Sequence, residues 1–436
     1  MRRIKNILIG ILAALALLQF VQFATRIVPI KPLGGVVAED PWPGFSIQSL
    51  KTQKFQEYIQ NYTGYRFGFR PLFVRLNNQY YYSFFRKSPY PNLVIGKEQY
   101  LYERQYIRSY FGENFIGEDR IDSSIQKLDT IRAFLHERGT ELVVVIAPDK
   151  ASFYPEYIPD YLARGKTASN YDLYAAKMNG DGIRVLDANK WFREMKRDAE
   201  YPLIPKEGTH WSIYGATVFA DSLLGFLEEA LGRKLYHFAV DSIDYPCLAR
   251  GTDRDLEELA NIFTFDRSRA YAYPASFSHQ PNDDGYKPDM LVISDSFFWT
   301  LYQGYLTQCF NSVTFWYYFS SIFPELPDRV ATTAEIDVVK YVLDKDVVVI
   351  LTSTDNLKDF GFGFVDYMYG YLMMDSEEKY SHLIPRYVNS IKNNRDLLEI
   401  IARKAEDKGI PLDSMIYLDA AWMARQHLLD LYPDQQ

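Results

Sequence analysis

Short apolar runs that alternate with helical patterns constrain the fold of this chain most. The runs are ELVVVIA (141–147), IRVLDA (183–188), DMLVISDSF (289–297) and DVVVILTST (346–354). Helical stretches lie between them, such as residues 212–232, where Ser212 is placed as the N-cap and Gly232 as the stop signal. Apolar strands that alternate with helices indicate a mainly parallel sheet covered on both faces. The sequence therefore predicts an α/β fold.

The N-terminus predicts a transmembrane helix. Residues 7–25 carry no charge, and the first six residues include two arginines and a lysine. Roughly 20 apolar residues span a bilayer as a helix, and positive charge before the span favours a cytoplasmic N-terminus. A cleaved signal peptide is the alternative, but no small-x-small cleavage site follows. Under either interpretation, most of the chain lies outside the cytoplasm.

The pattern along the chain predicts five segments. Residues 1–6 form a cytoplasmic N-terminus, and residues 7–25 the membrane anchor. An aromatic-rich juxtamembrane region at 26–95 shows no periodic core pattern, and residues 96–376 form the α/β domain. Within that domain, the turn-rich residues 233–285 read as an insertion. Residues 377–436 are predicted to be helical.

Composition excludes some functions. The net charge is -8 and no long basic run follows the first residues, so nucleic acid is not an expected partner. The six histidines are scattered and the two cysteines lack ligand spacing, so neither a metal nor another cofactor is expected. Cys247 and Cys309 either form a disulfide or are two buried thiols. Aromatic residues make up 16% of the chain, which suits core packing or, for exposed rings, stacking on sugars.

Polar residues that follow predicted strands are the candidates for chemistry, because ligands bind beyond the carboxyl ends of parallel strands. Ser296 follows one strand and is placed for nucleophilic attack, with His210 of the THW stretch as its general base. Read alone, Ser296 is a helix cap and His210 a structural histidine. Lys150 and Tyr154 follow another strand and are candidates for substrate contact. Asn356 follows the last strand and either donates a hydrogen bond to an oxyanion or caps a helix.

Four segments, taken in order, resemble the alginate O-acetyltransferase family of AlgX and AlgJ type. They are LVIGKEQYLYE (93–103), IAPDKASFYPEYIP (146–159), GTHWSIYGA (208–216) and LVISDSF (291–297). The resemblance implies an SGNH-hydrolase-like, three-layer α/β/α domain preceded by the transmembrane helix. It also implies a Ser-His-Asp triad that transfers acetyl groups to a polysaccharide. On this resemblance, Ser296 is the nucleophile and His210 the base. Asp295 is the aspartate that precedes the nucleophile, and it is a candidate for a place near the oxyanion or the substrate.

Two positions depart from the family pattern. Gly208 stands where the Asp-x-His-Trp motif has its aspartate, and Ser294 replaces the glycine of the Gly-Asp-Ser-Phe block. One hypothesis is that Glu207 replaces the missing acid. A second is a Ser-His dyad, with the ring oriented by a backbone carbonyl or by a distant acid such as Asp187. The third is an inactive site that retains glycan binding.

The predicted function is O-acetylation of a cell-surface or secreted exopolysaccharide through an acetyl-serine. A polysaccharide deacetylase or esterase, or an inactive glycan-binding assembly protein, is the alternative. The resemblance implies a membrane-bound O-acyltransferase partner that supplies acetyl groups. The predicted location is the inner (cytoplasmic) membrane, with a single span and the main domain in the periplasm.

Overall fold

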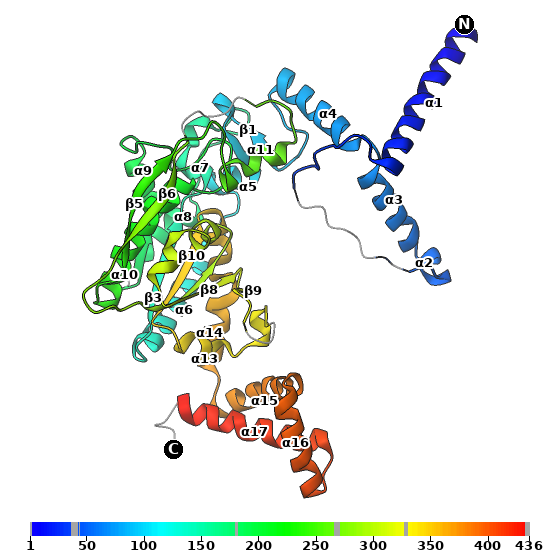
Figure 1. Cartoon of the computed structure of the whole chain (residues 1–436). Coiled ribbons are helices and arrows are strands. Elements are labelled where there is room, and N and C mark those ends of the chain that lie inside the picture. The colour runs from blue at the N-terminus through cyan, green and yellow to red at the C-terminus, as the bar shows by residue number, and fades with distance from the viewer. Residues whose placement is uncertain are drawn as a thin grey trace.

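The computed structural model describes residues 2–35, 42, 44–178, 182–265, 271–326 and 330–431 (Figure 1). Some residues lie outside this description, and they belong to the predicted segments 1–6, 26–95, 96–376, 233–285 and 377–436. The division into five segments therefore stays a prediction.

A six-stranded sheet lies at the centre of the molecule, with strand order β4-β3-β10-β7-β8-β9. The first five strands are parallel, and the short edge strand β9 runs antiparallel to β8. The predicted α/β fold with a mainly parallel sheet is confirmed. The strands are β3 (Glu141–Ala147), β4 (Arg184–Asp187), β7 (Asp289–Ser294), β8 (Ser312–Tyr317), β9 (Ser321–Phe323) and β10 (Val347–Ser353).

Helices cover both faces of the sheet, which explains why its strands are apolar at successive positions. On β10, Val347, Val349 and Leu351 join one core cluster, whereas Val348 and Ile350 join the other. The first cluster includes residues of α7 (Lys150–Phe153), α9 (Ala188–Met195), α10 (Ile213–Leu231) and α12 (Phe298–Tyr302). The second includes residues of α6 (Glu118–His136), α8 (Asn170–Met178), α13 (Val338–Leu343) and α14 (Phe364–Met373). These layers are the predicted α/β/α arrangement.

The predicted helix at 212–232 is observed as α10 with both of its expected ends. The Ser212 side chain accepts the N–H of Gly215, as an N-cap does. Gly232 follows the last turn with a φ of 64°, a left-handed conformation that glycine adopts without strain.

Smaller elements surround this domain. The hairpins are β1 (Leu93–Ile95) with β2 (Leu101–Glu103), and β5 (His237–Asp244) with β6 (Tyr273–Gln280). Short helices are α5 (Arg104–Tyr110), the 3₁₀ turn η3 (Gly251–Arg254), α11 (Asp255–Ala260) and the 3₁₀ segment η7 (Asp355–Gly363). The predicted C-terminal helices are observed as α15 (Ser376–Asn393), α16 (Arg395–Lys408) and α17 (Leu412–Leu431), which share their own core.

The N-terminal helix α1 (Arg2–Thr25) is long and apolar enough to cross a membrane, and it projects away from the sheet domain (Figure 1). It is followed by α2 (Ile47–Lys51), α3 (Lys54–Arg66) and α4 (Arg70–Phe85). The three C-terminal helices lie at the opposite end of the molecule (Figure 1). A membrane anchor at α1 fits its length, its composition and its exposed apolar side chains.

Candidate active site

Ser296 lies just beyond the carboxyl end of β7, where parallel sheets bind their ligands. Residues 290–295 and 297–298 are buried, whereas Ser296 is half-buried and reaches the surface. The carboxylate of Asp295 holds this turn, because Oδ1 accepts the N–H of Phe297 at 3.0 Å and Oδ2 accepts the N–H of Ser353 at 2.9 Å. The serine hydroxyl is therefore presented on a fixed turn.

His210 connects Ser296 to a carboxylate. Its Nε2 lies 2.9 Å from Ser296 Oγ, and its Nδ1 lies 3.0 Å from Asp255 Oδ2. The other oxygen of Asp255 accepts the backbone N–H of Thr209 at 2.8 Å. Because a carboxylate only accepts hydrogen bonds, the proton of a neutral ring sits on Nδ1, and Nε2 is left to receive the serine proton. This arrangement can activate a hydroxyl nucleophile.

Trp211 ties the histidine loop to the serine loop. Its indole Nε1 donates to the carbonyl of Phe297 at 3.1 Å, and its fully buried ring stacks on Phe219 with the centroids 4.7 Å apart. The ring of His210 meets Phe297 edge-on, with a centroid distance of 5.0 Å. These contacts fix the position of the imidazole relative to Ser296.

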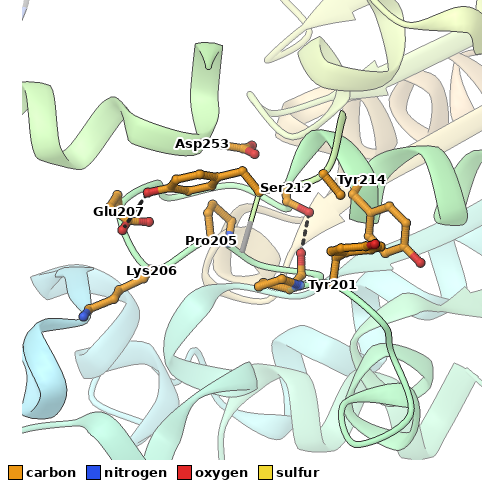
Figure 2. A pocket seen from close by; sticks show the side chains of 10 residues that line it. Tyr201, Pro205, Lys206, Glu207, Ser212, Tyr214 and Asp253 are labelled. Atoms are coloured by element: carbon orange, nitrogen blue, oxygen red, sulfur yellow. Dashed lines mark hydrogen bonds between the residues drawn. The ribbon is translucent and has the colours of Figure 1, made fainter. Parts of the chain in front are cut away.

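Glu207, predicted to be the acid of the triad, is not the partner of Nδ1. Its side chain is fully buried, and Oε1 accepts the hydroxyl of Tyr271 at 3.1 Å. Figure 2 shows Glu207 and Asp253 on the walls of a small pocket. Burial, reinforced by this carboxylate, raises the pKa of Tyr271. The position at Nδ1 is occupied by Asp255, which sequence reasoning did not identify.

The segment predicted to be an insertion carries Asp255, at the first residue of α11. Two residues earlier, the buried Asp253 accepts the N–H of Ile213 at 3.0 Å and the hydroxyl of Tyr273 at 2.9 Å. Burial raises the pKa of Asp253 to about 7. Asp253 thus joins η3 to the start of α10 and brings Asp255 within reach of His210. Acidic residues at a helix start are common, so their presence in the sequence did not mark this role.

Lys150 and Tyr154, predicted to contact substrate, instead support the loop before His210. The ammonium of Lys150 is fully buried and donates to the carbonyls of Lys206, at 3.1 Å, and Gly208. The hydroxyl of Tyr154 donates to the carbonyl of Ile204 at 3.3 Å. Burial lowers the pKa of Lys150 to about 7. A sequence pattern cannot reveal that these two polar groups point inward.

Asn356 and Asp295, both predicted near the oxyanion, bond to each other. The Asn356 amide donates to Asp295 Oδ2 at 2.8 Å, and Asp295, as a carboxylate, has no proton to give. The backbone N–H of Ser296 has no acceptor within the part of the chain that the structure describes. Roles of Asn356 and Asp295 toward the substrate stay predictions.

The remaining predicted residues lie in other environments. Asp187 caps α9 through the N–H of Lys190 at 2.8 Å and accepts the hydroxyl of Tyr171, and burial raises the pKa of its carboxyl. Cys247 is exposed and Cys309 is buried, and both are free thiols. Among the described residues, no group of three His, Cys, Asp or Glu side chains could hold a metal ion.

Residues 93–274 match a family model described as an SGNH hydrolase-like domain, acetyltransferase AlgX. This segment is therefore similar to the acetyltransferase domain of AlgX. The resemblance found in the sequence is therefore confirmed. The matched range contains His210 and Asp255, and Ser296 lies beyond its end.

The chain is similar to alginate O-acetylases of the AlgJ type. It is 29% identical over 133 residues to the probable alginate O-acetylase AlgJ of Pseudomonas syringae pv. tomato, over 30% of this chain and 32% of that protein. It is 28% identical over 134 residues to the protein of the same name from Pseudomonas aeruginosa, again over 30% and 32%. The matched stretch thus spans about a third of the length of these relatives.

Among solved structures, the O-acetyltransferase domain of Pseudomonas putida AlgJ is similar with a TM-score of 0.41 and 17% sequence identity. The likeness covers 64% of this chain and 99% of that domain.

Gly208, which replaces the aspartate of the AlgX and AlgJ motif, has a steric reason to be glycine. A Cβ atom at this position would lie 2.3 Å from the carbonyl oxygen of Thr252 and 2.8 Å from the carbonyl carbon of Asp253. The backbone of η3 thus passes directly against residue 208. The same segment carries Asp255, which contacts His210. A glycine in place of the motif aspartate therefore leaves the space in which this segment approaches residue 208.

Proposed function

We propose that the chain is an O-acetyltransferase that moves acetyl groups to a polysaccharide hydroxyl through an acetyl ester on Ser296. The observation that carries this proposal is the line of contacts from Ser296 Oγ to His210 Nε2, at 2.9 Å, and from His210 Nδ1 to Asp255, at 3.0 Å. Similarity to proteins named alginate O-acetylases supports acetyl as the transferred group and a polysaccharide as the acceptor.

In the first half-reaction, Ser296 Oγ attacks the carbonyl carbon of the acetyl donor while His210 Nε2 takes the hydroxyl proton. The tetrahedral intermediate collapses, the donor group leaves with that proton, and acetyl-Ser296 remains. Asp255 stabilises the imidazolium and keeps Nε2 directed at the serine. The N–H of Ser296 is available to the oxyanion that forms on the acetyl oxygen.

In the second half-reaction, a sugar hydroxyl attacks the acetyl carbonyl and His210 takes the hydroxyl proton. Collapse of the intermediate places the acetyl group on the sugar, and the proton returns to Ser296 Oγ. Water could replace the sugar as acceptor, which would make the protein an esterase. The contact between Ser296 and His210 favours either activity over an inactive glycan-binding protein.

We place the reaction outside the cytoplasm. Helix α1 would anchor the chain by a single span in the inner (cytoplasmic) membrane, with the sheet domain in the periplasm, because positive residues precede the span. A membrane-bound O-acyltransferase would supply the acetyl groups. This partner follows from the resemblance to AlgX and AlgJ proteins.

The function is tested by product analysis on the full chain in detergent, with p-nitrophenyl acetate as donor and unacetylated oligosaccharides as acceptors. We expect acetyl esters on the sugar, detected by mass spectrometry and NMR, and none with Ser296→Ala. Release of acetate alone at the same rate with and without sugar would identify an esterase. A folded chain that consumes no donor would contradict catalysis and favour glycan binding.

A further inference from the structure

An open cleft of about 540 Å³ lies at the carboxyl edge of the sheet, and its volume lies in the range of small-ligand sites. Its walls come from the N-terminal half of α6, from η7, and from the turn between β8 and β9. Asn356 lines the cleft and donates to Asp295, the residue before Ser296. One residue of the cleft wall thus contacts the direct neighbour of the proposed nucleophile.

Two aromatic side chains on the cleft wall, Tyr318 and Phe362, have a strained backbone. Their φ angles are 51° and 56°, a left-handed conformation that bulky residues rarely adopt. Their rings meet edge-on with the centroids 5.1 Å apart, and Tyr318 is 40% exposed. Strain of this kind gathers at binding and active sites, where the position of the side chain matters more than local stability.

Tyr318 is held close to the reacting serine. Its backbone N–H donates to the carbonyl of Ser294 at 2.8 Å, two residues before Ser296. Burial and the nearby Asp295 carboxylate raise the pKa of Tyr318, and a hydrogen bond with the Asn356 side chain opposes this shift. An exposed ring fixed at this place can support a sugar whose hydroxyl approaches Ser296.

The charges that line the cleft largely cancel. Lys127 pairs with Asp366 at 2.7 Å, and Lys358 pairs with the buried Asp355 at 3.4 Å. Arg120 and Asp359 are the remaining charged residues of the wall and have opposite signs. A polyanion would be attracted by clustered, unpaired cations. This balance of positive and negative charge instead suits the hydroxyl groups of an uncharged sugar.

We propose that this cleft binds a neutral pyranose unit of the acceptor polysaccharide, with the apolar face of the sugar on Tyr318 and Phe362 and its hydroxyls toward the polar wall. The role of this subsite in acetyl transfer rests on the proposed function. Binding of the sugar to the cleft does not depend on the proposed function.

The test uses two readouts on the full chain in detergent, with neutral hexaoses of glucose, galactose and mannose and with uronate hexaoses as probes. The first is sugar binding, followed by saturation-transfer NMR. The second is the rate at which sugar removes acetyl from Ser296 after loading with p-nitrophenyl acetate. The variant is Tyr318→Asn, because asparagine tolerates a left-handed backbone. Tyr161→Asn, at an exposed tyrosine outside the cleft, is the matched control.

We expect at least one neutral hexaose to bind, and to do so more tightly than the uronates. Tyr318→Asn should weaken that binding and slow acetyl transfer to it about tenfold, since an aromatic contact is lost. Acetyl loading in the absence of sugar should change much less than acetyl transfer to the sugar, a difference that a merely structural tyrosine would not produce. Tyr161→Asn should match the parent throughout.

Three results would overturn the proposal: binding of none of the neutral hexaoses, preference for uronates, or equal binding by the parent and Tyr318→Asn. If Ser296 took no acetyl while neutral-sugar binding still depended on Tyr318, the proposed acetyltransferase activity would be contradicted. The sugar subsite would still stand.

Discussion

Asp255→Asn is expected to slow acetylation of Ser296 by about 10⁴-fold, the size of the loss when a triad aspartate becomes an amide. The amide can donate to Nδ1 and would then favour the tautomer with its proton on Nε2, which cannot accept the serine proton. The hydrogen bond to the Thr209 N–H can persist through the amide oxygen, so the fold should remain. Stopped-flow release of p-nitrophenol from p-nitrophenyl acetate measures the rate.

Glu207→Gln is the matched control, since it makes the same chemical change in the acid that sequence reasoning preferred. Glutamine can still accept the hydroxyl of Tyr271, and Glu207 does not contact Nδ1. Its acetylation rate should therefore stay near that of the parent. A large loss in Glu207→Gln together with a small one in Asp255→Asn would show that Asp255 does not orient His210.

Gly208→Asp, which restores the motif of the AlgX and AlgJ family, is expected to abolish the proposed acetylation of Ser296. The added Cβ meets the carbonyl of Thr252 at 2.3 Å, so η3 must move. Overpacking of this kind costs about 1–3 kcal/mol of stability. Displacement of η3 also moves Asp255, and misplacement of a catalytic group by about 1 Å can cost 10²-fold in rate. Melting temperature and p-nitrophenol release measure the two effects.

Gly208→Ala separates the steric effect from the added charge. Alanine introduces the same Cβ without a carboxylate, so Gly208→Ala should be less stable and less active than the parent, much as Gly208→Asp is expected to be. If Gly208→Asp were as active as the parent and Gly208→Ala were not, the new aspartate would have replaced Asp255. The close approach of η3 would then not explain why this position is glycine.

Local patterns in the sequence predict the sheet, and together with the resemblance they predict the contact between Ser296 and His210. The apolar runs that became β3, β7 and β10 are continuous because both faces of the sheet are covered. Ser296 could be located because a serine directly after such a strand lies at the edge where ligands bind. His210 could be paired with it through the resemblance to AlgX and AlgJ proteins.

The carboxylate that contacts His210 could not be predicted, because its position depends on tertiary contacts. Asp255 lies 45 residues beyond His210, in a turn-rich segment with several other acidic residues. It reaches the ring because Asp253 anchors η3 to α10, and because Gly208 lets the two backbones approach. The environment of Lys150 could not be predicted for a related reason, since its spacing after β3 does not show that the ammonium is buried beneath the 206–208 loop.

The proposed acetyl-serine is tested most directly by the intact mass of the full chain after exposure to p-nitrophenyl acetate, followed by peptide mapping. We expect one added acetyl group on the peptide that contains Ser296, and none in Ser296→Ala. A folded parent chain that stays unmodified and releases no p-nitrophenol would contradict it. So would an acetyl group that appears equally in Ser296→Ala.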